Sequence, residues 1–271
     1  MESRDTLLDE LQRIEKWERE QKDLWFWEKL GRLPFVLLDK LTPKFLQDKA
    51  GQAIDELVSY VETGGKYLAA EKAILKRIDS VTSQPVTSIE EIRELPITAM
   101  KQAAYDLRKS RQKFATAQGA AAGLGGVFTL AIDIPLLLGL SLKTIQEVGM
   151  CYGYDPREKS ERLFIIKCLQ FTSSDIVGKK AILEDLSAMH QPEQERSRQV
   201  FAQLQGWREV LLMQTENFGW KKLFQMIPIA GILFGAYLNR KTIDEVAETA
   251  AMLYGKRRVL EKLAASEKAS I

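Results

Sequence analysis

The chain has 271 residues, of which 45% are hydrophobic and 28% charged, so it can bury a substantial core in one large domain or two small ones. Its formal net charge of +2 argues against a dedicated nucleic-acid-binding protein, because such proteins usually carry a large basic excess. The two cysteines, Cys151 and Cys168, cannot form a disulfide framework, so a reducing compartment is expected.

The N-terminal residues predict an amphipathic helix and no secretory signal. Residues 1–20 are densely charged and lack the continuous apolar stretch of a signal peptide. We expect a helix over residues 3–30, since apolar side chains recur there at helical spacing, at Leu7, Leu8, Leu11, Ile14 and Trp17. The expected location is cytoplasmic, either free or peripheral at the inner face of the plasma membrane.

An aromatic segment follows at residues 24–38. Trp25, Phe26, Trp27 and Phe35 stand near lysine and arginine residues, a combination typical of segments that lie at a membrane interface. These four residues are candidate membrane contacts. The alternative is that Trp25 and Phe26 pack on the helical bundle while Trp27 lies at its edge.

The rest of the chain predicts helices joined by short turns. No run alternates apolar and polar residues, and no Asn-Gly or Asp-Gly turn joins β-rich segments. Ser88 and Glu91 have the spacing of a capping box, and Asp155-Pro156 is typical of a helix start. Three glycines are expected to end helices: Gly153, Gly219 and Gly255. The expected helices are 33–41, 43–80 (or two helices divided at Gly64 and Gly65), 97–118, 156–171, 174–190, 193–218 and 240–265, with a loop at 81–87.

Two apolar segments, 119–142 and 223–238, stand out from this pattern. The first is long enough to cross a bilayer, but Asp133 would place a carboxylate in the hydrocarbon, and Pro135 is expected to break or kink the helix. The second is short for a span and contains Pro228. Basic residues flank both segments at both ends and give no inside–outside bias. We therefore expect the segments either to lie in a helical core or to dip into one leaflet.

The two segments also resemble each other. The letters KTIQEV at 143–148 follow the first segment and KTIDEV at 241–246 follow the second, and each run continues to a Tyr-Gly pair. We expect two glycine-rich helices that pack side by side, with a hypothetical ligand site between them. The candidate residues of this site are Asp133, Phe128, Leu137, Ile232, Phe234, Asn239 and Arg240.

Asp133 is singled out because a carboxylate in an apolar run must be paired, capped or functional. One expectation makes it the N-cap of a half-helix that begins at Pro135, or the partner of a lysine or arginine elsewhere. The other makes it a ligand or ion contact between helices, with Asn239 and Arg240 as the nearest candidate partners.

These elements predict an all-α fold: a single multi-helix bundle with two glycine-rich apolar central helices and an N-terminal amphipathic arm. We expect the arm at residues 1–42, the helical domain at 43–265 and a flexible tail at 266–271.

The stretch GAAAGLGGVFTLAIDIPLLLGLSLKTIQEVGMCYGYDP, together with IPIAGILFGAYLNRKTIDEVAETAAMLYGKRR, resembles the EcsC family of bacterial proteins. The glycine-rich run into F-T-L-x-x-D-x-P carries much of the likeness, and the P-x-x-G-x-x-x-G-x-x-x-N pattern from Pro228 to Asn239 supports it. The resemblance implies a bacterial protein without agreed catalytic residues. Through the name-giving member of the family, it also implies a link to an ABC-type exporter operon.

The sequence predicts no catalytic residue, metal site or cofactor. His190 is the only histidine, and neither G-x-S-x-G nor G-x-x-x-x-G-K-[ST] is present. Cys151, Cys168 and His190 lack the spacing of a zinc site. The predicted function is a non-enzymatic, membrane-associated accessory protein on the cytoplasmic face, with service to an ABC-type exporter implied by the resemblance. The alternative is a soluble helical module that binds a lipid or other hydrophobic small molecule between its apolar helices. The expected partners are a membrane surface or lipid and a membrane transporter, and no nucleic acid.

Overall fold

The computed structural model describes residues 2–22, 55, 59–60, 69–82, 85–124, 127–173, 176–187 and 228–269. Within these residues the fold is all-α, with eight helices and no strand, which confirms the predicted fold class. The helices are α1 (Arg4–Lys22), α5 (Glu71–Asp79), α6 (Ile89–Ile92), α7 (Ile97–Leu124), α8 (Val127–Cys151), α9 (Lys159–Ser173), α10 (Ile176–Ser187) and α12 (Pro228–Ala269).

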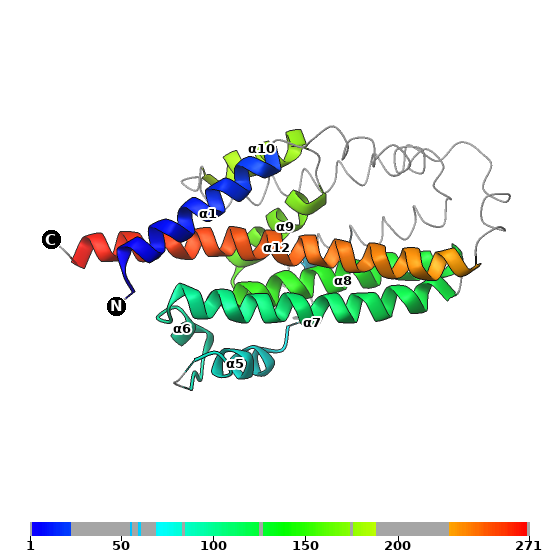
Figure 1. Ribbon diagram of the computed structural model, residues 1–271, viewed down its shortest axis with the longest axis horizontal. Helices are drawn as coiled ribbons and strands as arrows, with labels where there is room; N and C mark the ends of the chain where they lie inside the picture. Colours follow the sequence, from blue (N-terminus) through cyan, green and yellow to red (C-terminus); the bar gives the residue numbers. More distant parts are fainter. Residues whose placement is uncertain are drawn as a thin grey trace.

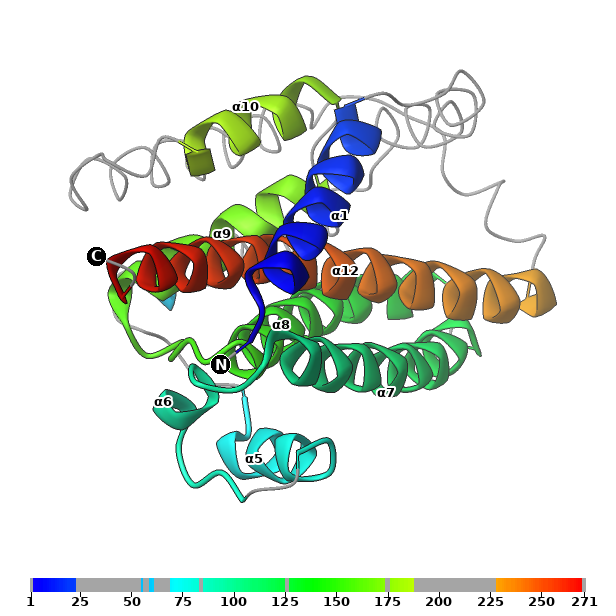
Figure 2. The same ribbon diagram turned by 60° about the vertical axis from the view of Figure 1, so that its left-hand side comes forward.

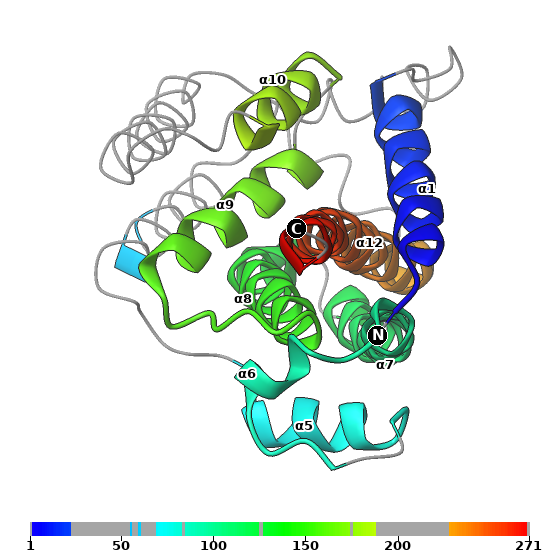
Figure 3. The same cartoon turned by 90° about the vertical axis from the view of Figure 1, so that its left-hand side faces the viewer.

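The long helix α12 is the centre of the bundle. Its 42 residues correspond to about 63 Å of helix at 1.5 Å per residue. α7, α8, α9 and α1 all pack against α12, and the end-on view in Figure 3 shows it between them. α5 and α6 lie beside α7 and α8 on the face away from α1 (Figures 1 and 2).

The two predicted apolar segments lie side by side, as expected. The first occupies the end of α7 and the beginning of α8, and the second lies at the beginning of α12. α8 and α12 pack against each other, and α7 contacts both. Across the ranges that the structure describes, no helix combines the length and the apolar content that a membrane crossing requires.

Three predicted helix boundaries are wrong. α8 is continuous from Val127 to Cys151, so Pro135 does not break it, because the helix hydrogen bonds and the packing outweigh the one bond that a proline removes; a kink there stays a prediction. Residues 228–238 of the second apolar segment and the final helix form the single element α12, which reaches Ala269. Gly255 lies inside α12 and does not end a helix. A Cβ atom there would lie 3.4 Å from the Tyr152 hydroxyl, so glycine permits a close approach.

Of three further boundaries, one agrees with the sequence pattern and two differ. Ser88 caps α6, since its hydroxyl accepts a hydrogen bond from the Glu91 N–H. The predicted 43–80 helix is divided before α5, where Ala70 has an extended backbone. Asp155 accepts a hydrogen bond from the Arg157 N–H and caps a turn, so α9 begins a few residues later than predicted. Several predictions fall outside the described residues: the helices 33–41 and 193–218, the helix division at Gly64 and Gly65, and the helix end at Gly219.

Gly153 ends α8, as predicted, in a left-handed conformation with φ of 78°. The Tyr154 N–H donates to the Gly149 carbonyl at 3.0 Å, and the Gly153 N–H donates to the Met150 carbonyl at 2.9 Å. This pair of bonds is a Schellman motif, which satisfies carbonyl groups at the end of the helix and favours glycine at its left-handed position. The turn sends the chain back along the bundle into α9.

The tyrosine of each Tyr-Gly pair packs against a glycine that belongs to, or precedes, the other pair. The Tyr254 ring of α12 lies over Gly149 of α8, where a Cβ atom would be only 2.8 Å from Cζ of the ring. In return, Tyr152, the first residue after α8, lies against Gly255 of α12. Both tyrosines are fully buried. The repeat therefore has a structural role, because each copy supplies a glycine that receives the tyrosine of the other.

The described part of the predicted N-terminal arm, α1, is docked on the bundle. Leu7, Ile14 and Trp17 are buried, and the Trp17 ring lies 5.7 Å from that of Phe171 in α9. Leu8, which the helical pattern also selected, remains exposed. Polar contacts add to the packing: Lys101 donates to Glu10 at 2.5 Å, and Lys256 donates to Glu18 at 2.8 Å. The predicted boundary at residue 42 lies outside the described residues and stays a prediction.

Candidate functional site

A small hydrophobic cluster fixes the relative register of α7, α8 and α12. Ala115, Leu140 and Ile243, one from each helix, are buried together, and Leu137 is half-buried against them. We call Ala115, Leu140 and Ile243 the three-helix cluster. Because these side chains touch, the three residues mark one level along the bundle.

Toward the α7–α8 turn, the helices carry almost no charge beyond Ala115 on α7, Leu140 on α8 and Arg240 on α12. This part comprises residues 116–124 of α7, 127–139 of α8 and 228–239 of α12, and we call it the apolar end. Asp133 is its only acidic or basic residue. At 1.5 Å per residue, the three helices extend about 14, 20 and 23 Å beyond the three-helix cluster. In Figure 1 it is the end of the bundle where the orange start of α12 lies beside α7 and α8.

Basic residues gather at the level where the apolar end begins. Lys113, Lys143, Arg240 and Lys241 each stand within three residues of a member of the three-helix cluster, and we call them the basic belt. Three of them are exposed and Lys143 is half-buried. Lys241 lies 3.9 Å from Glu245 in an exposed pair, which is a weak interaction in water. The belt therefore presents positive charge to the solvent around the base of the apolar end.

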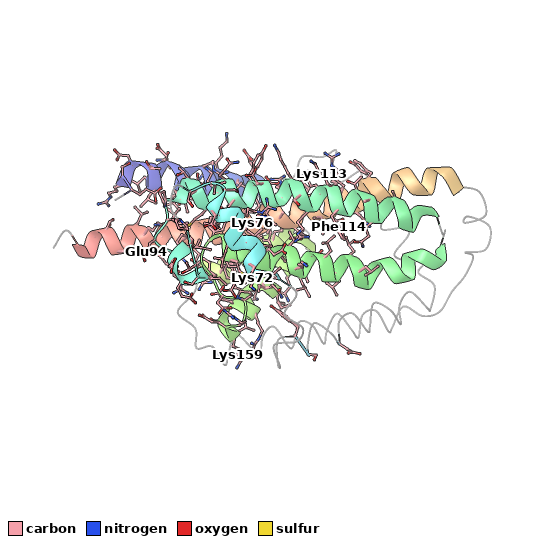
Figure 4. The ribbon with its side chains drawn as sticks, turned by 90° about the horizontal axis from the view of Figure 1, so that it is seen from below. Lys72, Lys76, Glu94, Lys113, Phe114 and Lys159 are labelled. Carbon is pink, nitrogen blue, oxygen red and sulfur yellow. The ribbon has the colours of Figure 1, made fainter. Side chains whose placement is uncertain are left out.

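Large apolar side chains are exposed at the same place. Phe114, Leu136 and Tyr237 have exposed fractions of 56%, 54% and 61%. Figure 4 shows Lys113 and Phe114 on α7, farther along the bundle than Lys72 and Lys76 of α5. These three residues lie on three different helices, and single exposed apolar residues are common on proteins, so they count here only because of their level beside a charge-free stretch.

The structure brings together part of the predicted ligand site. Leu137 packs against the three-helix cluster, Asn239 is buried, and Arg240 is exposed in the basic belt. The backbones of Phe128 and Asp133 lie in α8 and those of Ile232 and Phe234 in α12, but their side chains are outside the described part. A hydrophobic pocket between the helices therefore stays a prediction.

The predicted N-cap role of Asp133 is wrong. α8 begins at Val127, so Asp133 lies inside the helix, and no half-helix starts at Pro135. The predicted membrane contacts Trp25, Phe26, Trp27 and Phe35 lie outside the described residues, and their role stays a prediction.

Two arginines of α7 that the sequence analysis did not select hold the site in place. Arg111 donates to the carboxylate of Glu147 in α8 at 2.5 Å and 2.7 Å, and Glu147 is fully buried. Burial raises the pKa of Glu147, although Arg111 opposes the change. Arg108 and Gln112 hydrogen-bond to Asp244 of α12. α7 thus binds a carboxylate in each copy of the repeat, KTIQEV and KTIDEV.

The spacing of the two arginines in the sequence is consistent with these contacts, but only the structure identifies their partners. Arg108 and Arg111 stand three residues apart, on one face of a helix. Phe114 could have been selected because Lys113-Phe114 ends the charged part of α7, and Tyr237 because it ends an apolar stretch before Arg240. Aromatic residues beside lysine or arginine at such a boundary are typical of membrane interfaces.

The described residues offer little for catalysis. No group of three or more histidine, cysteine or acidic side chains among them could hold a metal ion. Cys151 and Cys168 are buried free thiols, and burial raises the pKa of Cys151 to about 12, so the reactive thiolate is disfavoured at neutral pH. His190 lies outside the described residues.

Comparison with known proteins identifies the family. The model of the EcsC protein family matches residues 9–259. The uncharacterized protein YdbA of Bacillus subtilis (strain 168) is 52% identical over 268 residues, which cover 98% of each chain. Protein EcsC of the same organism is 25% identical over 235 residues, covering 85% of this chain and 92% of its own. The chain therefore belongs to the EcsC family, as its motifs predicted. No solved structure matches it.

Proposed function

We propose that the protein is a non-enzymatic accessory protein that binds a membrane surface peripherally and serves a membrane transporter. The observation that carries the membrane part is the combination of the apolar end with the basic belt at its base. Proteins that lie in a membrane interface bury an apolar surface in lipid and place lysine and arginine near the anionic headgroups. The exposed Phe114 and Tyr237 supply the aromatic residues that such interfaces favour.

Vesicle flotation of the full-length chain tests membrane binding. We expect the protein to float with vesicles of equal parts phosphatidylglycerol and phosphatidylethanolamine. Because salt screens the attraction between cations and anionic lipids, binding should weaken as salt is raised. Vesicles of phosphatidylcholine alone should bind less protein. A chain that remains at the bottom of the gradient with anionic vesicles at low salt would overturn the proposal.

The transporter part of the proposal rests on the family resemblance and needs its own test. Chemical crosslinking in native membranes, followed by purification of the protein, is expected to join it to a subunit of an ABC-type exporter. If crosslinking captures lipid and no transporter subunit, the protein acts at the membrane without this partner.

A further inference from the structure

We infer that the apolar end enters the hydrocarbon of one leaflet and that the basic belt binds the phosphates of anionic glycerophospholipids above it. This inference rests on the proposed membrane binding and names the part of the chain that performs it. The observations behind it are the length of the apolar end, its low charge, and the level of the exposed side chains at its base. The one carboxylate that enters the leaflet is that of Asp133, seven residues beyond Leu140, at a cost of up to about 2.5–3.5 kcal/mol.

The length of the apolar end matches one leaflet. The hydrocarbon core of a bilayer is about 30 Å thick, so one leaflet contributes about 15 Å. The three helices extend about 14, 20 and 23 Å beyond the three-helix cluster, which suffices for one leaflet and falls short of a crossing. Helices suit this environment because their backbone hydrogen bonds are formed within the element.

The exposed residues lie at the levels that such an insertion requires. Phe114 is one residue from Ala115, on the side away from the apolar end, while Leu136 and Tyr237 lie four and six residues beyond Leu140 and Ile243. Along the bundle they span a band of about 11 Å. Phe114 is level with the basic belt, while Leu136 and Tyr237 lie about 6 Å and about 9 Å beyond the three-helix cluster. Phe114 therefore lies at headgroup level, with Leu136 and then Tyr237 beneath it.

The charge of the same band selects an anionic surface. Lys113 and Arg240 are exposed and form no ion pair among the described residues, so both can bind lipid phosphates. Two acidic residues lie at this level: Asp244 binds Arg108 and Gln112 of α7, and the exposed Glu245 lies 3.9 Å from Lys241. Burial alone would raise the pKa of Asp244, but the hydrogen bond from Arg108 holds it below its usual value, so it stays ionised and paired. The cations therefore dominate the charge that this band presents.

Fluorescent labels at single positions of the full-length chain test the depth. Leu136→Cys, Tyr237→Cys and, as a control, Tyr105→Cys each receive a polarity-sensitive fluorophore; the native cysteines 151 and 168 are buried. Tyr105 is 50% exposed and lies ten residues from Ala115, on the other side of the belt. We expect a blue shift on anionic vesicles at positions 136 and 237 and none at 105. Equal spectra at all three positions would overturn the inference.

Paired substitutions test the same surface by affinity. Phe114→Ser with Tyr237→Ser is expected to weaken binding to anionic vesicles at least about tenfold, while Tyr105→Ser with Leu260→Ser leaves it unchanged. Lys113→Gln with Arg240→Gln is expected to weaken it about tenfold and to flatten the salt dependence. Lys72→Gln with Lys76→Gln on α5 is the matched control and should change neither. Circular dichroism confirms that each variant is folded.

The outcomes separate this inference from the proposed function. The unmodified chain could float with anionic vesicles while neither the Phe114 and Tyr237 variant nor the Lys113 and Arg240 variant binds more weakly. In that case the inference is wrong and the membrane function stands. The triple variant Trp25→Ser, Phe26→Ser, Trp27→Ser could instead lose binding while the Phe114 and Tyr237 variant keeps it. That result would assign the membrane contact to the N-terminal aromatic segment. If the unmodified chain does not bind anionic vesicles, the proposed function fails.

Discussion

Replacing Arg257 by leucine is expected to destabilise the protein by about 3–5 kcal/mol, measured by urea denaturation, because it leaves a buried carboxylate without its partner. Arg257 Nη2 lies 2.6 Å from Glu161 Oε1, and the Glu161 side chain is 2% exposed. Glu161 would then have to remain charged in a poorly solvated environment or take up a proton on folding.

The double variant Arg257→Leu, Glu161→Gln is the control for this effect. It removes the charge together with its partner, so it should be less destabilised than Arg257→Leu alone. Equal losses in the single and double variants would show that the effect comes from lost packing of the arginine side chain.

The loss should also depend on pH. Burial raises the pKa of Glu161 above the ordinary value of 4.5, even with Arg257 opposing the change. A group whose pKa is raised in the folded state contributes stability at low pH, and that stability is lost as pH rises through the folded-state pKa. The difference in unfolding free energy between Arg257→Leu and the unmodified protein should therefore be smallest in acid and grow with pH. A difference that is constant across this range would contradict the assignment to Glu161.

The residues around this pair show what the Tyr-Gly motifs do in the fold. The Arg257 guanidinium lies 4.1 Å from the centre of the Tyr154 ring, and Arg258 Nε donates to the Tyr152 carbonyl at 2.9 Å. The Tyr254 and Phe164 rings are 4.6 Å apart. The motifs Y-G-Y and Y-G-K-R-R thus hold the C-terminal half of α12 against α8 and α9. Their role is to fix the helices that carry the apolar end.

Much of this fold could be predicted because its determinants are local. Helical spacing selects Leu7, Ile14 and Trp17 as the buried face of α1, and Ser88 is found as a cap from its spacing to Glu91. The predictions failed where tertiary packing overrides a local preference. Pro135 weakens a helix in isolation, but α8 packs on α7 and α12 and continues through it. Gly255 would favour a helix end, yet here it accommodates the Tyr152 ring.

The candidate site shows a second limit of the same kind. The sequence identifies the two apolar stretches and the basic residues that flank them. The sequence does not show which residues of two packed helices lie at the same level, because the 3.6-residue period describes one helix at a time. Only the contact of Ala115 with Leu140 and Ile243 shows that Lys113, Lys143 and Arg240 lie within about 9 Å of one another along the bundle. The belt is therefore a property of the packed bundle.

Gly153→Ala is expected to destabilise the protein by about 2–4 kcal/mol, from strain of about 1–2 kcal/mol at a left-handed residue and a further overpacking cost. At φ of 78°, a Cβ atom on residue 153 would lie 2.7 Å from Arg93 Cγ and 3.0 Å from the Arg93 backbone nitrogen. The backbone atom cannot yield as a flexible side chain would. The clash also strains the hydrogen bond that Arg93 Nε donates to the Gly153 carbonyl at 2.8 Å, which joins the α6 turn to the end of α8.

Gly139→Ala on the same helix is the matched control. A Cβ atom at residue 139 would meet nothing within 4 Å, and alanine favours the helix over glycine by about 0.5–1 kcal/mol. Gly139→Ala should therefore be neutral or slightly stabilising. Thermal and urea unfolding of both variants beside the unmodified protein measure the two effects. If Gly153→Ala unfolds at the same denaturant concentration as Gly139→Ala, the left-handed turn at Gly153 is not needed to join α8 to α9. The same result would contradict the close packing of that turn against Arg93, because the backbone strain and the clash with Arg93 both follow from the conformation of Gly153.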